Sequence, residues 1–185
     1  MPAVEPVARP LRALIELNTD LVLNCLDGIS EADARARLAG VTNSISFLLA
    51  HIADARFFLA KLVGRPLENP LETRLSGVRS IDDAPSLPPL GELRGIWVAI
   101  SGHVLQAVDE ATAGQWAGPS GSEYAFPVAD PTLLGAVAFL VQHESYHLGQ
   151  ISLLRKARGF AAMSYRRSGA GGKGSAGGHG SEASV

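Results

Sequence analysis

The sequence predicts an all-α fold, a four-helix bundle with long crossover connections. Apolar residues recur every three or four positions through four long stretches, which is the period of helices that bury one face. No stretch shows the alternation of polar and apolar residues that is typical of a half-buried strand. The length of 185 residues suits one domain rather than two.

The first predicted helix covers about residues 9–28, and a short helix follows it. Gly28 closes the first helix because glycine readily takes the left-handed conformation at a helix end. The segment from Ser30 to Asp33 resembles a capping box, and we expect the helix that it opens to end near Gly40.

The second long helix is predicted to begin at a cap formed by Asn43 or Ser44 and to end at Gly64. Residues 64–89 contain several prolines and show no sustained period, so we expect a long irregular connection there. The third long helix is expected over about residues 90–113.

The last long helix is predicted to follow a second irregular stretch over 114–128. Asp130 is a suitable N-cap and Pro131 suits the first helical position, so the helix should run from there to Arg158. One helical domain is therefore predicted over 1–167. Residues 168–185 are almost all Gly, Ser and Ala, and we expect a disordered tail there.

Composition and charge exclude several classes of protein. Hydrophobic residues make up 46% of the chain and the formal net charge is −2, so neither disorder nor long-range attraction to nucleic acid or anionic membranes is expected. No signal-peptide pattern and no apolar run of about 20 residues is present. The single cysteine, Cys25, is expected in the core. These features predict a soluble, cytoplasmic protein.

Two histidines in the last predicted helix are the strongest indication of function. His143 and His147 are four positions apart, so their rings project from one helical face and can bind one divalent ion. That face continues the buried apolar stripe, which places the pair inside the bundle. The alternative is a pair of core histidines that are hydrogen-bonded to neighbouring groups.

His51 is the third candidate ligand. It stands alone in the apolar stripe of the second long helix, where a single histidine is more often a hydrogen-bonded core residue. Three inward histidines on two helices are explained more economically by one metal site. Three imidazoles also leave a coordination position open, as in catalytic metal sites.

Two other kinds of metal site fit the sequence less well. The pattern His-Glu-x-x-His is typical of zinc peptidases, but Gln150 and Leu153 stand where the longer form of that motif has glycine and the third histidine. The only acid further along the chain is Glu182, in the predicted tail. A ferritin-like di-iron site needs a second Glu-x-x-His, and no other Glu has a His three residues later.

Two segments carry a family resemblance: residues 43–53, with the letters NSI and LAHIA, and residues 143–151, HESYHLGQI. With them the chain resembles the DinB/YfiT-like superfamily of metal-binding four-helix bundles over about residues 9–160. The resemblance implies a homodimer and one divalent ion, Zn or Ni above all. It also implies hydrolase activity or transferase and isomerase activity with a low-molecular-weight thiol. The implied metal ligands are His51, His143 and His147.

The predicted function is that of a metal-dependent enzyme acting on a small-molecule substrate, with the ion activating water or a thiol. Glu144 is the candidate catalytic residue, as general base or as an acceptor that orients a ligand; the alternative is a solvated acid on the helix flank. The alternative function is a non-catalytic metal-binding bundle, a sensor or a structural dimer. Gln150 either orients a ligand or fills a gap, and His103 is expected to be an ordinary buried or rim histidine. Four aromatic residues either wall a pocket or pack in the core: Trp97, Trp116, Tyr124 and Phe126.

Overall fold

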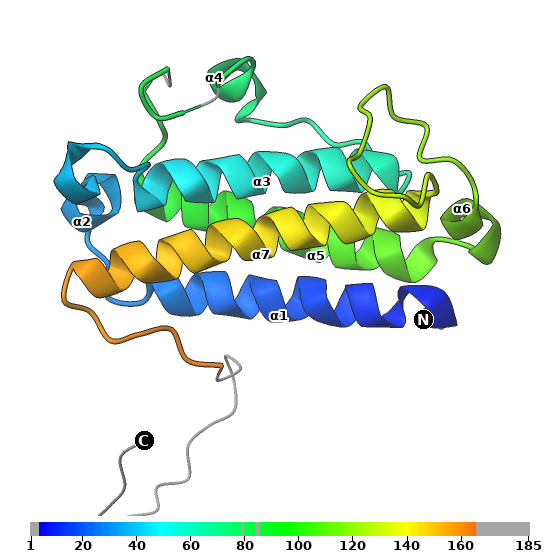
Figure 1. The fold of residues 1–185 in the computed structure, drawn as a ribbon, viewed down its shortest axis with the longest axis horizontal. Helices are drawn as coiled ribbons and strands as arrows, with labels where there is room; N and C mark the ends of the chain where they lie inside the picture. Colours follow the sequence, from blue (N-terminus) through cyan, green and yellow to red (C-terminus); the bar gives the residue numbers. More distant parts are fainter. Residues whose placement is uncertain (1–3, 79, 84–85, 166–185) are drawn as a thin grey trace, which may run out of the picture.

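Four long helices lie side by side along the length of the molecule (Figure 1). The computed structural model describes residues 4–78, 80–83 and 86–165, and within these ranges the chain is helical and contains no strand. The all-α prediction is therefore confirmed for the described part of the chain. The four long helices are α1 (Arg9–Leu26), α3 (Ile45–Leu62), α5 (Leu90–Glu110) and α7 (Leu133–Ala157).

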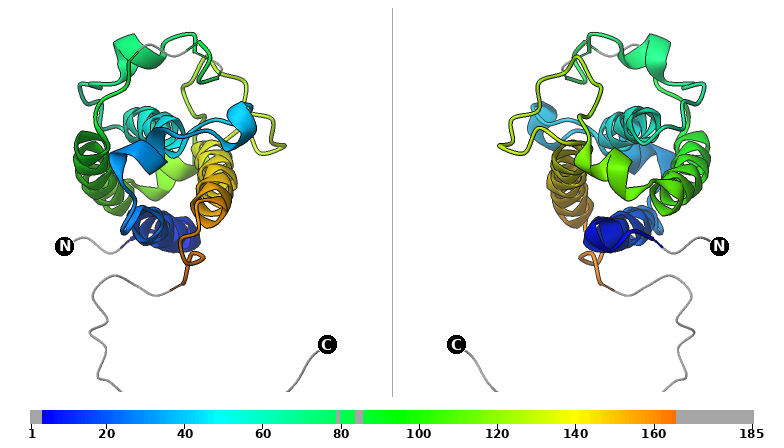
Figure 2. Two further views of the ribbon diagram at one scale, coloured as in Figure 1. Left: turned by 90° about the vertical axis from the view of Figure 1, so that its left-hand side faces the viewer. Right: turned by 90° about the vertical axis from the view of Figure 1, so that its right-hand side faces the viewer.

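Each of the four long helices contacts two of the others. Helix α1 packs against α5 and α7, and α3 packs against the same two helices. Seen end-on, α1 and α3 therefore occupy opposite corners, with α5 and α7 at the other two (Figure 2). This arrangement places α3 directly beside α7, and these two helices carry the candidate metal ligands.

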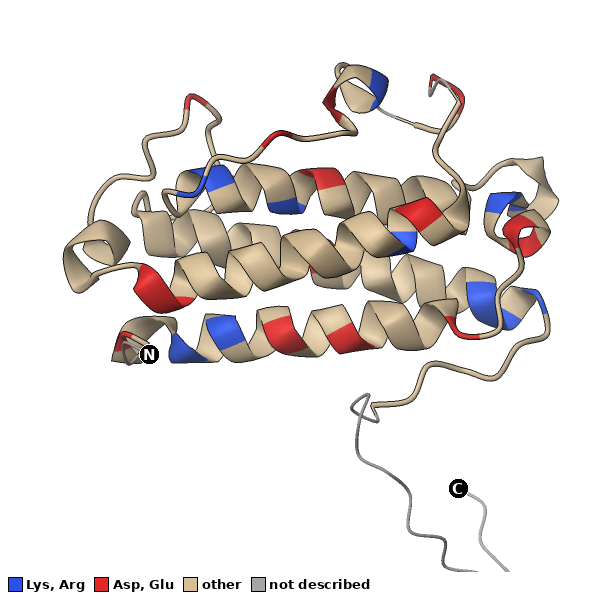
Figure 3. Cartoon of the chain, turned by 180° about the vertical axis from the view of Figure 1, so that it is seen from behind, with Lys and Arg blue, Asp and Glu red and all other residues tan. Residues whose placement is uncertain are grey.

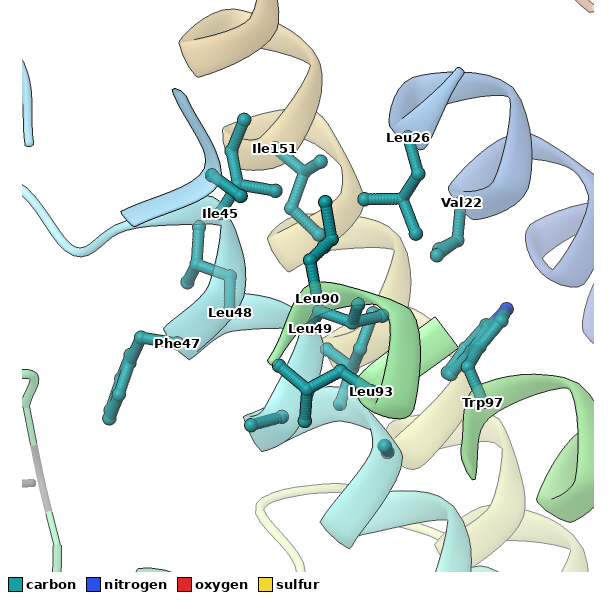
Figure 4. Packing of buried hydrophobic residues seen from close by; sticks show 14 of the residues in the cluster. Val22, Leu26, Ile45, Phe47, Leu48, Leu49, Leu90, Leu93, Trp97 and Ile151 are labelled. Carbon is teal, nitrogen blue, oxygen red and sulfur yellow. The ribbon is translucent and has the colours of Figure 1, made fainter. Parts of the chain in front are cut away.

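The apolar core consists of two clusters of buried side chains. In the first cluster, Leu26 of α1, Leu49 of α3, Leu93 of α5 and Ile151 of α7 come together (Figure 4). The second cluster lies toward the other end of the helices, around Ile100. Each long helix contributes to both clusters, so burial of these apolar faces holds all four together.

A layer of polar side chains lies between the two apolar clusters. Its members come from all four long helices and lie, along each helix, at the level where one cluster gives way to the other. We call this group the polar layer, and hydrogen bonds join its members across the helices. It consists of Asn18, Thr19, Arg56, Ser101, Glu144 and Ser145.

Two predicted helix starts are confirmed at the level of the cap. The Ser30 hydroxyl accepts a hydrogen bond from the Asp33 amide and opens α2 (Glu31–Arg35). Of the two candidate caps for α3, Ser44 is the one used, because its side chain accepts from the Phe47 amide. The helix after Ser30 is shorter than predicted: α2 ends at Arg35, and a separate 3-10 turn, η2 (Leu38–Gly40), follows.

The predicted cap of the last helix is wrong. Thr132, not Asp130, caps α7, and its side chain accepts from the Gly135 amide. Asp130 instead accepts hydrogen bonds from the amide and hydroxyl of Thr132, and so orders the turn before the helix. The start therefore shifts to Leu133, with Pro131 outside the helix.

The connections between the long helices contain two short helices that the sequence did not predict. Helix α4 (Glu72–Leu75) lies within the connection after α3. The third long helix, α5, ends at Glu110. Helix α6 (Ala113–Ala117) follows, and a capping box with Thr112 as its N-cap opens it. The rest of this second connection arches over α3 and α7 near one end of the molecule (Figure 1).

Two expectations from composition can be compared with the described part of the structure: the absence of a membrane-spanning helix and the burial of Cys25. Acidic and basic residues are interspersed along the helices (Figure 3). Within the described ranges, no helix is both long enough and apolar enough to cross a bilayer. Cys25 is buried, and burial raises the pKa of its thiol to about 11, as befits a core residue. The predicted tail over 168–185 lies outside the described residues.

Candidate metal centre

Three histidines meet where α3 and α7 pack against each other. His51 comes from the first half of α3, and His143 and His147 lie one turn apart on α7. The Nε2 atom of His143 is 3.2 Å from Nε2 of His51 and 3.1 Å from Nε2 of His147. One nitrogen from each ring lies within 4.8 Å of the other two. The structure thus brings together the three residues that the sequence singled out.

This spacing suits a shared metal ion. In a tetrahedral site with metal–nitrogen bonds of about 2.0–2.1 Å, two ligand nitrogens lie about 3.3–3.4 Å apart. The observed separations of 3.1 and 3.2 Å are close to that value. Nitrogens that face one another across such short distances repel unless a proton or a cation lies between them. A divalent cation satisfies all three rings at once, so the donor set fits a metal.

Burial keeps the three rings in the form that binds metal. The pKa of His51 is lowered to about 4, chiefly by burial and further by the neighbouring His147 and His143. Burial is also the main cause of the lowered pKa of both His143 and His147. Lower pKa values favour neutral rings near pH 7, so a metal ion does not have to displace a proton.

A neighbouring side chain orients the His147 ring. The Nδ1 atom of His147 donates a hydrogen bond of 2.8 Å to Oε1 of Gln150, which leaves the Nε2 lone pair directed at the other histidines. The amide of Gln150 in turn donates to the Tyr146 hydroxyl at 3.2 Å. Of the two roles that the sequence left open for Gln150, the contacts favour that of orienting a ligand.

Replacing Gln150 with alanine should weaken metal binding while leaving the fold intact. Loss of the acceptor frees the His147 ring to rotate and to change tautomer, and such losses typically lower metal affinity about 10- to 100-fold. Competition with a chromogenic chelator measures the effect. Gln142→Ala is the matched control, because Gln142 is an exposed residue of the same helix. Equal affinity in the two variants would contradict the orienting role.

The DinB superfamily sequence model matches residues 14–151, more than half of the chain. The chain belongs to the DinB superfamily. The match includes both histidine-bearing segments, and it confirms the resemblance drawn from residues 43–53 and 143–151. A comparison with curated proteins finds no match to this DinB-superfamily chain.

Glu144 lies beside the centre in sequence but faces a different group. Its two carboxylate oxygens accept hydrogen bonds of 2.6 and 2.8 Å from Nε and Nη2 of Arg56. Both side chains are buried, so the solvated-acid alternative for Glu144 is wrong. Because Arg56 engages both oxygens, the carboxylate is held in the polar layer. The general-base role stays a prediction.

Arg56 is the main residue of this DinB-superfamily chain that sequence reasoning missed. Its guanidinium lies 3.8 Å from the centre of the Trp97 ring and donates to the hydroxyls of Thr19 and Ser101. It also donates to the backbone carbonyl of Ile15 at 3.1 Å. Its position as the single arginine of the largely apolar helix α3 was the available indication.

The remaining candidates divide between core and pocket. Trp97 and Trp116 are buried and pack in the core, whereas Tyr124 and Phe126 line a cavity beside His143. His103 is exposed on α5 and is not part of the histidine cluster. The sequence left two roles open for these aromatic residues, and both occur: the two tryptophans pack in the core, and Tyr124 and Phe126 line the cavity.

Asp54 was missed as well. It follows His51 by three residues on α3 and lines the same cavity as His143. Its carboxylate accepts a 2.6 Å hydrogen bond from the side-chain amide of Asn69. Burial raises the pKa of Asp54. Its position one helical turn after a predicted ligand was the indication in the sequence.

Proposed function

We propose that this protein is a divalent-metal-dependent enzyme in which His51, His143 and His147 hold one ion, Zn²⁺ or Ni²⁺. The proposal rests on the convergence of three Nε2 atoms. That of His143 lies 3.1 Å from Nε2 of His147 and 3.2 Å from Nε2 of His51. Imidazole nitrogen is a preferred ligand of both metals. Three protein ligands leave at least one coordination position for a small molecule.

The proposed reaction is hydrolysis or the transfer of a low-molecular-weight thiol to a small-molecule substrate. When bound, the ion supplies Lewis acidity that lowers the pKa of a coordinated water or thiol toward neutrality. Phe47 stacks beside His51 with their ring centroids 6.3 Å apart, and Phe139 beside His143 at 6.2 Å, so apolar rings flank two of the three histidines. We propose that the carboxylate of Asp54, which lines the cavity at His143, acts as the proton acceptor.

The arrangement of the four long helices in one bundle, and the bounds of the domain, are part of the same proposal. We infer that α1, α3, α5 and α7 form a DinB-like four-helix bundle within a domain over 1–167, with residues 63–89 and 111–132 as its long connections. The pairwise packing of the four helices supports this inference. The homodimer implied by the family resemblance is a separate expectation, which sedimentation of the purified protein tests.

The test begins with elemental analysis of protein purified without a polyhistidine tag. We expect about one divalent ion per chain, since one open three-histidine site binds one ion. Turnover of an activated ester, and of a thiol with an aromatic electrophile, is then measured for the metal-loaded and chelator-treated protein. Turnover that requires both the metal and His143 supports the enzyme.

Two results would contradict the proposal in different ways. A metal that raises the melting temperature without any turnover favours the sensor or structural alternative. Protein that contains no metal and takes none up overturns the metal centre itself.

A further inference from the structure

A cavity of about 390 Å³ adjoins the metal centre. It lies between α3, α7 and the connection that precedes α7, and His143 forms part of its wall. Small-molecule sites commonly measure about 300–1,000 Å³, so the volume suits a small ligand. Because a proposed metal ligand, His143, forms part of the wall, a molecule in the cavity would lie beside the metal centre.

Aromatic rings form a continuous wall from the connection to His143. The Phe126 centroid lies 6.2 Å from that of Phe58 and 5.7 Å from that of Phe139. Phe139 stacks in turn on the His143 ring at 6.2 Å with an interplanar angle of 27°. Tyr124 packs edge-on against Phe126 at 4.9 Å and is 54% exposed, so it stands at the mouth of the cavity. Such a wall favours an apolar or aromatic group, whose removal from water is favourable.

Asp54 is the one charged side chain among the residues that line this cavity. Asn69 holds its carboxylate through the amide hydrogen bond of 2.6 Å. Burial is the main cause of the raised pKa of Asp54, and the nearby carboxylate of Glu72 raises it further. An anionic substituent that contacts Asp54 is repelled by this carboxylate, whereas a neutral or cationic group in the same place is not.

We propose that this cavity binds the aromatic or branched apolar group of an uncharged or cationic substrate whose donor atom ligates the metal. The inference rests on the proposed function and adds to it the class of substrate. The rings select the apolar group, Asp54 selects against a negative charge, and His143 joins the cavity to the metal.

Cobalt-loaded protein provides a test that does not depend on turnover. Three thiols of similar acidity serve as probes: phenylmethanethiol, 2-mercaptoethanol and 4-(sulfanylmethyl)benzoate. Cobalt absorption bands and calorimetry report their binding. We expect phenylmethanethiol to bind about 10-fold or more tightly than 2-mercaptoethanol, because its phenyl ring is buried. The benzoate should bind at least about threefold more weakly than phenylmethanethiol because of repulsion by Asp54.

Two variants assign these preferences to the cavity. Phe126→Ala should remove most of the preference for the phenyl ring, whereas Tyr165→Ala, at an exposed aromatic residue, should keep it. Asp54→Asn should bring the benzoate to the affinity of phenylmethanethiol. Unchanged cobalt binding in each variant shows that the fold is retained.

The outcomes separate this inference from the proposed function. Cobalt affinity is measured first, without thiol, and failure to bind overturns both proposals. If cobalt binds but the two neutral thiols bind equally well, or Phe126→Ala keeps the phenyl preference, only the inference about the cavity is overturned. Equal affinity of the benzoate and phenylmethanethiol in the unmodified protein overturns the selection against negative charge.

Discussion

Replacing His51 with alanine should lower the affinity of the protein for Zn²⁺ by about 100- to 1,000-fold. Zinc bound by four protein ligands contributes about 10–16 kcal/mol, so the loss of one ligand costs about 3–4 kcal/mol. His51 is also the one ligand from α3, and without it only the two α7 histidines remain. Chelator competition at a fixed pH measures the affinity.

His103→Ala provides the matched control for His51→Ala. His103 is an exposed histidine of α5 outside the cluster, so its removal should leave zinc affinity unchanged. Circular dichroism of both metal-free variants checks that the helices are retained. If His51→Ala binds zinc as tightly as His103→Ala, the three-histidine centre is wrong, whatever the behaviour of the α7 pair.

Replacing Arg56 with methionine should destabilise the metal-free protein by about 3–5 kcal/mol. The methionine leaves the Glu144 carboxylate buried and without the guanidinium that donates to both of its oxygens. An unpaired buried charge is costly because the interior cannot solvate it. Urea unfolding, followed by circular dichroism, measures the change.

An exposed ion pair supplies the control for Arg56→Met. Arg35 pairs with Glu31 on α2, where each side chain is 45% exposed, and it also donates to the backbone carbonyls of Leu87 and Pro88 at 3.3 and 3.4 Å. Because the pair is exposed, Arg35→Met should cost much less than Arg56→Met. The double variant Arg56→Met with Glu144→Leu should be more stable than Arg56→Met alone, because no charge is left unpaired. A cost for Arg56→Met no larger than that for Arg35→Met would show that the buried pair is unimportant.

The features predicted well from sequence are those set by local geometry. Ser44 caps α3 through an amide three residues away, and His143 meets His147 because four residues make about one helical turn. The cap of α7 was mispredicted because two local motifs compete there. Asp130 forms a turn with Thr132, and Thr132 takes the capping role.

The features that were missed depend on partners far apart in the chain. Arg56 and Glu144 are separated by 88 positions, and nothing local to either indicates that they face each other. His51 was predicted only because three inward histidines suggested one site and a family resemblance supported it. The sequence did not decide whether Tyr124 and Phe126 line a cavity, because they lie in an irregular connection whose packing follows no sequence period.

The polar layer has a consequence for the alignment of the ligand-bearing helices. Apolar side chains tolerate sliding, since one methyl group substitutes for another, but the guanidinium of Arg56 matches its acceptors only in one position. A shift of α3 along α7 by one turn, about 5.4 Å, would break every one of those bonds. These hydrogen bonds therefore keep His51 level with the other two imidazoles, so the folded chain by itself sets the geometry of the proposed metal centre.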